Sequence, residues 1–321
     1  MSKEKILITG ASGFIGYHLC KKILSLKKYQ LTCIDVKKSD KKNLLKDFVK
    51  NKDFKYLKLD LNNLKKKKFQ NFSYVFHLAA IVGVKQVNNN PLNSFVNNTF
   101  IFSNLIHNLE TNSSKTKIIF FSTSEVYGPL SDLGKLNYPT KEDINLLISK
   151  KTKGRDSYYL SKMFGEKTLE FSKLNYCILR PHNIYGPYMG FKHVISELIK
   201  KLSSKKNSFK IYSPNHTRSF CYIDDAVTQI LKLSFNNRSN KKIFNIGNPK
   251  DEIKIKKLSI LIKKILNSKI KLTNGPNTIG SPRRRVPSIN KTLKITKKIY
   301  FTSLNEGIKK TIKWYDKQKR A

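Results

Sequence analysis

The sequence predicts an α/β fold, a doubly wound parallel sheet with a smaller α/β lobe at the C-terminal end. Short β-rich runs alternate with segments of helical periodicity through the first half of the chain, as in a parallel sheet covered by helices on both faces. The length of 321 residues suits about two domains. The alternation becomes less regular in the second half. We therefore expect one domain at 1–180 and a second at 181–321, with segments around 220–247 returning to the first.

The periodicities place each element in order. Strands are expected at 5–9, 31–36, 56–59, 74–78, 117–122, 176–179 and 243–246. Helices are expected at 16–26, 95–109, 157–174, 194–202, 224–235, 258–266 and 304–315. No apolar run approaches the roughly 18 residues of a membrane span, and the N-terminus lacks the apolar core of a signal peptide. We expect a cytoplasmic protein that does not bind membranes.

The net charge of +43 raises the question of nucleic-acid binding. Lysine and arginine total 64 against 21 acidic residues, but only eight are arginine. A dedicated nucleic-acid surface favours arginine for its planar guanidinium, and AT-rich codons explain the lysines. Nucleic-acid binding is therefore not expected as the main function, although the positive field should attract anionic ligands. The four cysteines include no CxxC pair, so neither a metal site nor a disulfide framework is predicted.

A glycine-rich turn joins the first expected strand to the first expected helix. Gly10, Gly13 and Gly16 permit a tight turn and a close approach of the backbone to a pyrophosphate. The helix begins near Phe14 and Ile15, where its free N–H groups and partial positive charge favour phosphate. The pattern predicts a dinucleotide site.

Asp35 ends the second expected strand, 19 residues after the last of these glycines. A carboxylate there can accept hydrogen bonds from the adenosine ribose and would repel a 2′-phosphate. The cofactor is therefore expected to be NAD rather than NADP, although Lys37 and Lys38 lie nearby. Asp60, after the third expected strand, could meet the adenine or could serve only in a turn.

A Tyr-x-x-x-Lys pair places both side chains on one helical face. The lysine ammonium can then lower the pKa of the phenol and make it a usable general base. Only one pair follows the segment 122–128 at the carboxyl end of a buried strand, where open α/β sheets bind ligands. That pair is Tyr158/Lys162; the others are Tyr17/Lys21, Tyr188/Lys192 and Tyr315/Lys319.

Five motifs occur in one order along the chain: Gly10-x-x-Gly13-x-x-Gly16, His77-Leu78-Ala79-Ala80, 122–128, Tyr158-x-x-Ser161-Lys162 and 180–187. With them the chain resembles the extended short-chain dehydrogenase/reductases, specifically the NAD-dependent nucleotide-sugar epimerase/dehydratase family, over nearly its whole length. The resemblance implies a Rossmann domain with tightly held NAD and a lobe that binds a nucleoside-diphosphate sugar, with UDP favoured. It also implies a homodimer formed through two helices per subunit, at 95–109 and 157–174.

The resemblance also implies roles for individual residues. Tyr158 would take the proton of the sugar C4 hydroxyl as hydride passes to NAD, with Lys162 as its partner and Thr123 on the same sugar oxygen. Glu125 is the further catalytic candidate. The expected cofactor contacts are Gly10, Gly13, Phe14, Ile15, Gly16, Asp35, Asp60, Leu61, Leu78, Ala79, Ala80, Asn98, Tyr158, Lys162 and Pro181. The expected substrate contacts are Ser124, Asn183, Arg218 and Arg285.

The fate of the 4-keto sugar sets the reaction. A 4-epimerase turns the sugar and returns hydride to its other face, so it needs no further base. Glu125 could act at C5 or C6, but the Asp that family dehydratases usually carry before this Glu is Ser124 here. The triplet 123–125 and the stretch 285–289 also resemble UDP-glucuronate decarboxylases. We expect a UDP-sugar 4-epimerase of surface-polysaccharide precursor synthesis, with a UDP-glucuronate decarboxylase or a nucleotide-sugar 4,6-dehydratase as alternatives.

Two other classes stay open: an NAD-binding regulatory protein without chemistry, and a nucleic-acid-binding protein on the same scaffold. The intact catalytic residues argue against the first. Among the remaining polar residues, Tyr127 and Tyr185 are expected to line walls, Asp225 to orient structure, and His193 and His216 to be exposed.

Overall fold

The computed structural model describes residues 3–37, 44–64, 69–112, 115–191, 193–204, 206–278 and 280–320. Lys38 and Lys192 lie outside the described residues. The chain forms two compact units. The first comprises Met1–Val126, Leu146–Arg180 and Ile230–Phe244, and the second comprises Tyr127–Asn145, Pro181–Gln229 and Asn245–Ala321.

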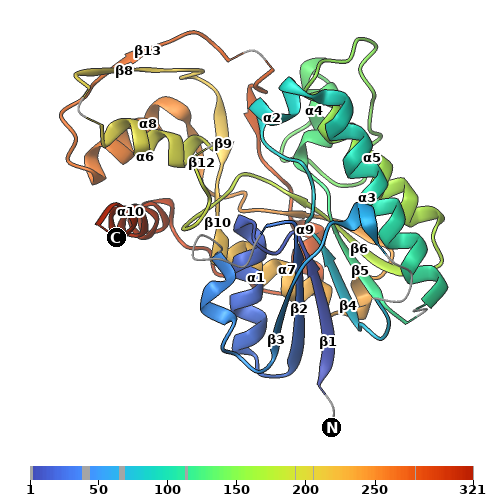
Figure 1. The fold of residues 1–321 in the computed structure, drawn as a ribbon. Coiled ribbons are helices and arrows are strands. Elements are labelled where there is room, and N and C mark those ends of the chain that lie inside the picture. Colours follow the sequence, from blue (N-terminus) through green and yellow to red (C-terminus); the bar gives the residue numbers. More distant parts are fainter. Residues whose placement is uncertain are drawn as a thin grey trace. The chain divides into compact units, whose positions relative to one another are not determined.

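The first unit is built on a seven-stranded sheet in the order β11-β6-β5-β4-β1-β2-β3 (Figure 1). The neighbouring pairs from β6 to β3 are parallel. The strands are β1 (Glu4–Thr9), β2 (Tyr29–Asp35), β3 (Phe54–Lys58), β4 (Tyr74–His77), β5 (Lys117–Phe121), β6 (Asn175–Pro181) and β11 (Lys242–Ile246). The predicted α/β fold is confirmed. Chain order reverses between β4 and β1, which is where such sheets bind ligands.

Alternation along the strands supplies apolar side chains to both faces of this sheet. Leu7, Ile118 and Phe120 belong to a buried cluster with residues of α3 (Pro91–Asn112) and α5 (Asp156–Phe171). Ile6 and Ile8 alternate with Leu7 and are also fully buried. The remaining helices of this unit are α1 (Phe14–Ser25) and α2 (Val84–Asn89), and its 3₁₀ turns include η1 (Leu44–Phe48) and η2 (Leu61–Asn63).

Close packing brings α5 onto β5. A Cβ added to Gly165 would lie 2.4 Å from Cζ of Phe120, so glycine is needed at this point of the helix. The helix ends at Phe171, three residues before the predicted end, because Ser172 takes an extended conformation. Leu174 still reaches the core, but from the connecting turn.

The second unit contains short strands and several helices. The predicted helices at 194–202, 224–235, 258–266 and 304–315 are confirmed within a few residues at each end. They are α6 (Val194–Leu202), α7 (Ile223–Ser234, whose last turn belongs to the first unit), α8 (Ile255–Ile265) and α10 (Leu304–Arg320), joined by α4 (Gly128–Asp132) and α9 (Asn290–Thr296). No described helix has both the length and the apolar character needed to cross a membrane.

The short strands of the second unit were not predicted. They pair as β10-β7, β12-β9-β14 and β13-β8. Each has only two to four residues, too few to show a period-two pattern. Their bounds are β7 (Ile184–Tyr185), β8 (Ser208–Ile211), β9 (Thr217–Ser219), β10 (Cys221–Tyr222), β12 (Glu252–Lys254), β13 (Lys271–Asn274) and β14 (Arg284–Arg285).

The sequence predicted exposed side chains for two histidines, His193 and His216. His193 is exposed, as predicted. The prediction for His216 was wrong: it is buried, because it immediately precedes β9, the central strand of its small sheet. Burial and the charges of Arg218 and Arg283 lower the pKa of His216.

Candidate active site

The glycine-rich turn depends on two of its three glycines for packing. Gly10 has a φ of +70°, and a Cβ on it would lie 2.6 Å from the backbone N of Ala79. A Cβ on Gly16 would lie 2.6 Å from the carbonyl oxygen of Ala11. Gly13 is less confined, and as the N-cap of α1 it leaves the helix start bare of a side chain.

The start of α1 fits a pyrophosphate. The first N–H groups of an α-helix have no partner within the helix, and α1 has neither an acidic residue in its first turn nor a side-chain cap. Gly13, Phe14 and Ile15 are partly exposed there, whereas Gly16 is buried. Their N–H groups and the partial positive charge of the helix would hold the phosphates of a bound NAD.

Asp35 lies beside this turn at the end of β2. The backbone N–H of Ser12 donates to its Oδ2 at 2.9 Å, and the N–H of Lys37 donates to its Oδ1 at 3.2 Å. These two donors fix the carboxylate at the edge of the turn. Each carboxylate oxygen can accept more than one hydrogen bond, so Asp35 keeps acceptor capacity for ribose hydroxyls.

Asp60 and Leu61 have local structural roles. The Asp60 carboxylate caps η2 by accepting from the backbone N–H and the side-chain amide of Asn62, each at 2.9 Å. Leu61 is buried in the core of the first unit. Their contacts with a cofactor stay predictions.

Asn98 of α3 holds the segment that follows β4. Its Oδ1 accepts from the N–H of Ile81 at 2.7 Å, and its Nδ2 donates to the carbonyl of Ile81 at 3.2 Å. The same Nδ2 lies 3.4 Å from Oγ of Ser161 on α5. Asn98 thus ties α5 to the segment that packs against Gly10, which contains the predicted cofactor residues Leu78, Ala79 and Ala80.

Tyr158 and Lys162 lie on one face of α5, near the carboxyl end of β5. Lys162 is 4% exposed, and its Nζ lies 5.0 Å from the centre of the Phe120 ring and 5.9 Å from that of Tyr158. Thr123, two residues beyond β5, lies close enough to the Tyr158 hydroxyl for its side chain to lower the pKa of the phenol. The structure therefore brings together the three residues that the sequence singled out for proton transfer.

Burial dominates the electrostatics of this group. It raises the pKa of Tyr158, with a further rise from Glu125, while the hydrogen bond with Thr123 opposes the rise. Burial lowers the pKa of Lys162 to about 7, and Glu166 counteracts that fall. The phenol is thus held protonated, and Lys162 is not among the groups that lower its pKa, contrary to expectation.

Glu125 is engaged in an ion pair. Nη2 of Arg155 lies 2.7 Å from its Oε1, and Nε of Arg155 donates to Oε2 at 3.3 Å. Both side chains are partly exposed, at 22% for Glu125 and 30% for Arg155. Arg155 stands one turn before Tyr158 on the chain, a partner that sequence reasoning missed. Ser124, between Thr123 and Glu125, is buried.

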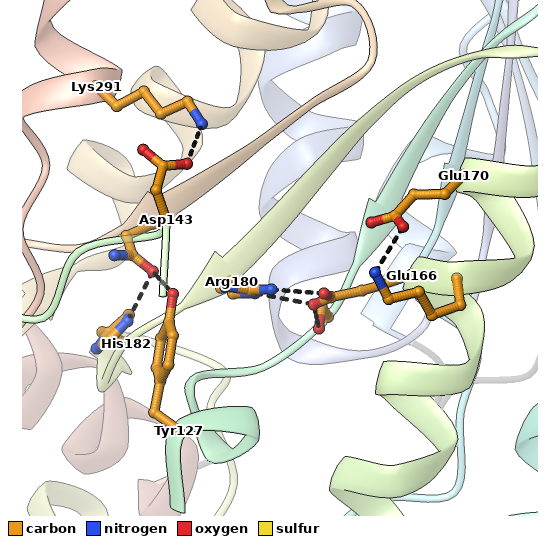
Figure 2. Close-up of polar contacts among 10 residues, drawn as sticks. Tyr127, Asp143, Glu166, Glu170, Arg180, His182 and Lys291 are labelled. Atoms are coloured by element: carbon orange, nitrogen blue, oxygen red, sulfur yellow. Dashed lines mark hydrogen bonds and ion pairs between the residues drawn. The ribbon is translucent and has the colours of Figure 1, made fainter. Parts of the chain in front are cut away.

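A second missed group joins α5 to the sheet. Figure 2 shows Arg180 of β6 with both guanidinium contacts on Glu166. Nε donates to Oε1 at 2.9 Å and Nη2 to Oε2 at 2.6 Å, while Ser122 Oγ also donates to Oε1. Glu166 follows Lys162 by four residues, a spacing that could have revealed it as the next member of the same helical face.

The second unit brings two of the predicted substrate residues together. Arg218 of β9 and Arg285 of β14 are register partners across a parallel pair. Arg218 donates to the carbonyl of Thr217 at 2.7 Å and to Oγ of Ser281 at 2.8 Å. Asn183 follows Pro181 at the end of β6, has a φ of +38°, and donates to the carbonyl of Ser219 at 2.9 Å.

Asn245 is the centre of a hydrogen-bond network in the second unit. Its Oδ1 accepts from the Tyr127 hydroxyl at 2.9 Å and lies 3.1 Å from Nε2 of His182. Figure 2 labels Tyr127 and His182. Its Nδ2 donates to the carbonyls of Thr140 and Ser288. Tyr127 is 2% exposed, and its place in a wall of the site stays a prediction. Nothing in the sequence around Asn245 marked it as this centre.

Comparison with known proteins identifies relatives. A family model described as the NAD dependent epimerase/dehydratase family matches residues 6–247. The chain is 33% identical over 298 residues to the bifunctional polymyxin resistance protein ArnA of Wigglesworthia glossinidia brevipalpis, covering 86% of this chain and 43% of that protein. It is 29% identical to the UDP-N-acetyl-alpha-D-glucosaminuronate decarboxylase of Bacillus cytotoxicus, over 98% of both.

The fold is similar to solved structures of enzymes. One is the UDP-glucuronic acid 4-epimerase of Bacillus cereus in complex with UDP-glucuronic acid and NAD, with a TM-score of 0.85, 25% identity and coverage of 98% of this chain and 99% of that one. Another is the UDP-glucose 4-epimerase of Thermotoga maritima, with a TM-score of 0.82 and 25% identity, over 98% and 99%. The glycine turn, the Tyr158/Lys162 pair and the family match agree: this chain belongs to the NAD-dependent epimerase/dehydratase family and is an enzyme that uses NAD.

Proposed function

We propose that the protein is a UDP-sugar 4-epimerase that works through a 4-keto sugar. The observation that carries this proposal is the pairing at the end of β5: Thr123 meets Tyr158, whereas Glu125 is bound to Arg155. The first pair supports oxidation at C4. In the second, Arg155 occupies both oxygens of the carboxylate that further chemistry at C5 or C6 would need.

The chain's own residues would divide the work as follows. The Tyr158 phenol accepts the proton of the C4 hydroxyl, and Thr123 hydrogen-bonds the same oxygen and aligns it. Lys162 supplies a positive charge that favours the phenolate and binds the nicotinamide ribose. Bound NAD supplies a hydride acceptor and later donor. Lys162 is buried and Tyr158 is partly buried, so the site limits the access of water to the proton transfer.

Binding of the diphosphate is assigned to the arginines of the second unit. Arg218 and Arg285 are adjacent in register, and guanidinium groups suit phosphate because they donate two parallel hydrogen bonds. Arg284 lies between two such groups in sequence, but its charge is paired with Glu252. The nucleotide is proposed to be UDP because the structural relatives named above bind UDP-sugars.

A decarboxylase is the second candidate. The triplet 123–125 and the stretch 285–289 favour it, as do relatives named as decarboxylases. The two reactions make opposite demands on Glu125, because only the decarboxylase needs a group acting beyond C4.

We further propose a homodimer formed through α3 and α5. Apolar side chains at helical spacing remain exposed on both helices, and buried apolar surface drives association. They are Leu92, Val96 and Phe100 on α3, and Phe164 and Phe171 on α5. We also propose that the protein is cytoplasmic, since the reaction uses NAD and nucleotide sugars.

The decisive experiment is incubation with a panel of UDP-, dTDP- and GDP-sugars, read by mass spectrometry and NMR. UDP-glucuronate heads the panel because relatives named for epimerisation and for decarboxylation both act on it. Unchanged mass with a new sugar spectrum is expected. Loss of carbon dioxide or of water would replace the epimerase proposal with a decarboxylase or a dehydratase.

A further inference from the structure

We propose that Glu166 is a positioning residue for catalysis: held by Arg180 and Ser122, it keeps Lys162 charged and anchors the strand end that carries Thr123. The inference rests on the catalytic roles proposed above. It concerns a buried carboxylate that touches neither substrate nor cofactor and acts through its neighbours.

The first step is placement. Tyr158, Lys162 and Glu166 follow one another at intervals of four along α5, so they share one helical face. Lys162 and Glu166 are 4% and 2% exposed. A carboxylate at this depth is stable only when its oxygens are bonded, and Arg180, itself 2% exposed, engages both. Glu166 is therefore held in one position.

The second step is charge. Lys162 faces Tyr158 and Glu166 on its own helix, His77 of β4 and the ring of Phe120 on β5. Burial and the charge of Lys162 lower the pKa of His77, so this imidazole is neutral. Burial drives the pKa of Lys162 down to about 7, and Glu166 is the carboxylate that opposes the fall. Removing Glu166 should leave Lys162 neutral at physiological pH.

The third step is the strand end. Ser122 donates its hydroxyl to Glu166, and its N–H donates to the carbonyl of Leu179 on β6 at 2.8 Å. The next residue is Thr123, whose side chain interacts with the Tyr158 phenol. One carboxylate thus links the helix that carries Tyr158 and Lys162 to the residue before Thr123.

The test measures NAD affinity by calorimetry from pH 5.5 to 9 on protein stripped of nucleotide. A protonated Lys162 forms charge-assisted hydrogen bonds with the ribose, which are stronger than neutral ones. Wild-type affinity should therefore fall as pH rises through about 7. In Glu166→Gln the midpoint should move to lower pH by about one unit, which is roughly tenfold in affinity above the midpoint.

Because Glu166→Gln leaves Arg180 buried and unpaired, it could unfold the protein. The double variant Glu166→Leu/Arg180→Leu removes both charges and is expected to fold, since apolar replacement of a buried pair is often tolerated. Because it removes two opposite charges, it should show a smaller acid shift than Glu166→Gln, together with a lower kcat and a KM nearly unchanged. Ser122→Ala leaves the Glu166 carboxylate in place. The midpoint of the pH dependence of NAD affinity should therefore stay at the wild-type value, and only kcat should fall.

Glu170→Gln is the matched control. Glu170 lies one turn further along α5 (Figure 2) and pairs with the exposed Lys167. It should match wild type in every measurement. A folded double variant with the wild-type midpoint and kcat would overturn the proposal. If the midpoint shifts as expected but no sugar nucleotide is converted even by the wild type, the proposed function fails while this inference stands.

Discussion

Replacing Tyr158 with phenylalanine removes one hydroxyl from the site and little else. If that hydroxyl is the general base, kcat should fall by about 10²-fold or more, while steady-state KM stays nearly unchanged. Tyr159→Phe is the control, because this neighbour is 4% exposed and its hydroxyl has no hydrogen-bond partner in the described part of the chain. Should Tyr17 or Tyr315 prove essential instead, the argument from position after β5 is wrong.

Glu125 separates the two candidate reactions. In a 4-epimerase, Glu125→Gln should leave turnover within a few-fold, because the carboxylate is engaged with Arg155 and takes no part in the chemistry. In a decarboxylase or dehydratase it should lower product formation by about 10²-fold or more, with NADH absorbance accumulating at 340 nm. That second result would refute the epimerase proposal.

We expect Asp35 to set the preference for NAD over NADP. Its carboxylate is fixed beside the turn by the N–H groups of Ser12 and Lys37, so a 2′-phosphate would meet a negative charge. Thermal unfolding should show clear stabilisation by saturating NAD and much less by NADP. Asp35→Asn should reduce the difference between the thermal stabilisation given by NAD and that given by NADP. Protection by NADP but not by NAD would contradict this assignment.

At the scale of elements, Gly10 in the glycine turn has both a left-handed backbone conformation and close contact with neighbouring backbone. Gly10 and Gly134 have almost the same φ, +70° and +69°, but only Gly10 has backbone within reach of an added Cβ. Gly134→Ala should therefore show only the strain of the left-handed conformation, about 1–2 kcal/mol in urea unfolding. Gly10→Ala should lower the free energy of unfolding by more than Gly134→Ala does. It should also weaken NAD binding, because the segment at Ala79 must move. Equal losses of unfolding free energy for the two variants would show that close packing is not what requires glycine at position 10.

At the scale of the whole molecule, the exposed apolar side chains of α3 and α5 bear on assembly. Light scattering of the wild type should give twice the 37.2 kDa of one chain. Phe100→Lys with Phe164→Lys should give a monomer, because two charges per subunit would enter the contact. Tyr300→Lys is the control: this residue is 78% exposed but lies outside both helices. A monomeric wild type would contradict the dimer proposal.

Local pattern was enough to predict the framework of the protein. Strands such as β5, with five successive buried residues, and helices such as α8 leave periodic signals within the span of one element. The turn at Gly10–Gly16 is likewise read within seven residues. Family membership followed from the order of such segments. These features depend on neighbours in sequence, so the sequence by itself determined the fold class, the use of NAD and the placement of Tyr158 and Lys162 on one helix.

The tertiary structure alone decided which distant polar groups meet. Arg155 reaches Glu125 across 30 residues, Glu166 meets Ser122 across 44, and Tyr127 meets Asn245 across 118. Pairs at such separations leave no periodic trace, and each partner alone looks like an ordinary surface or core residue. Their pairing follows from strand order, since β5 and β6 are neighbours and α5 packs on them. The ion pair of Glu125 and the pKa of Lys162 therefore depend on long-range packing and burial, which no local pattern encodes.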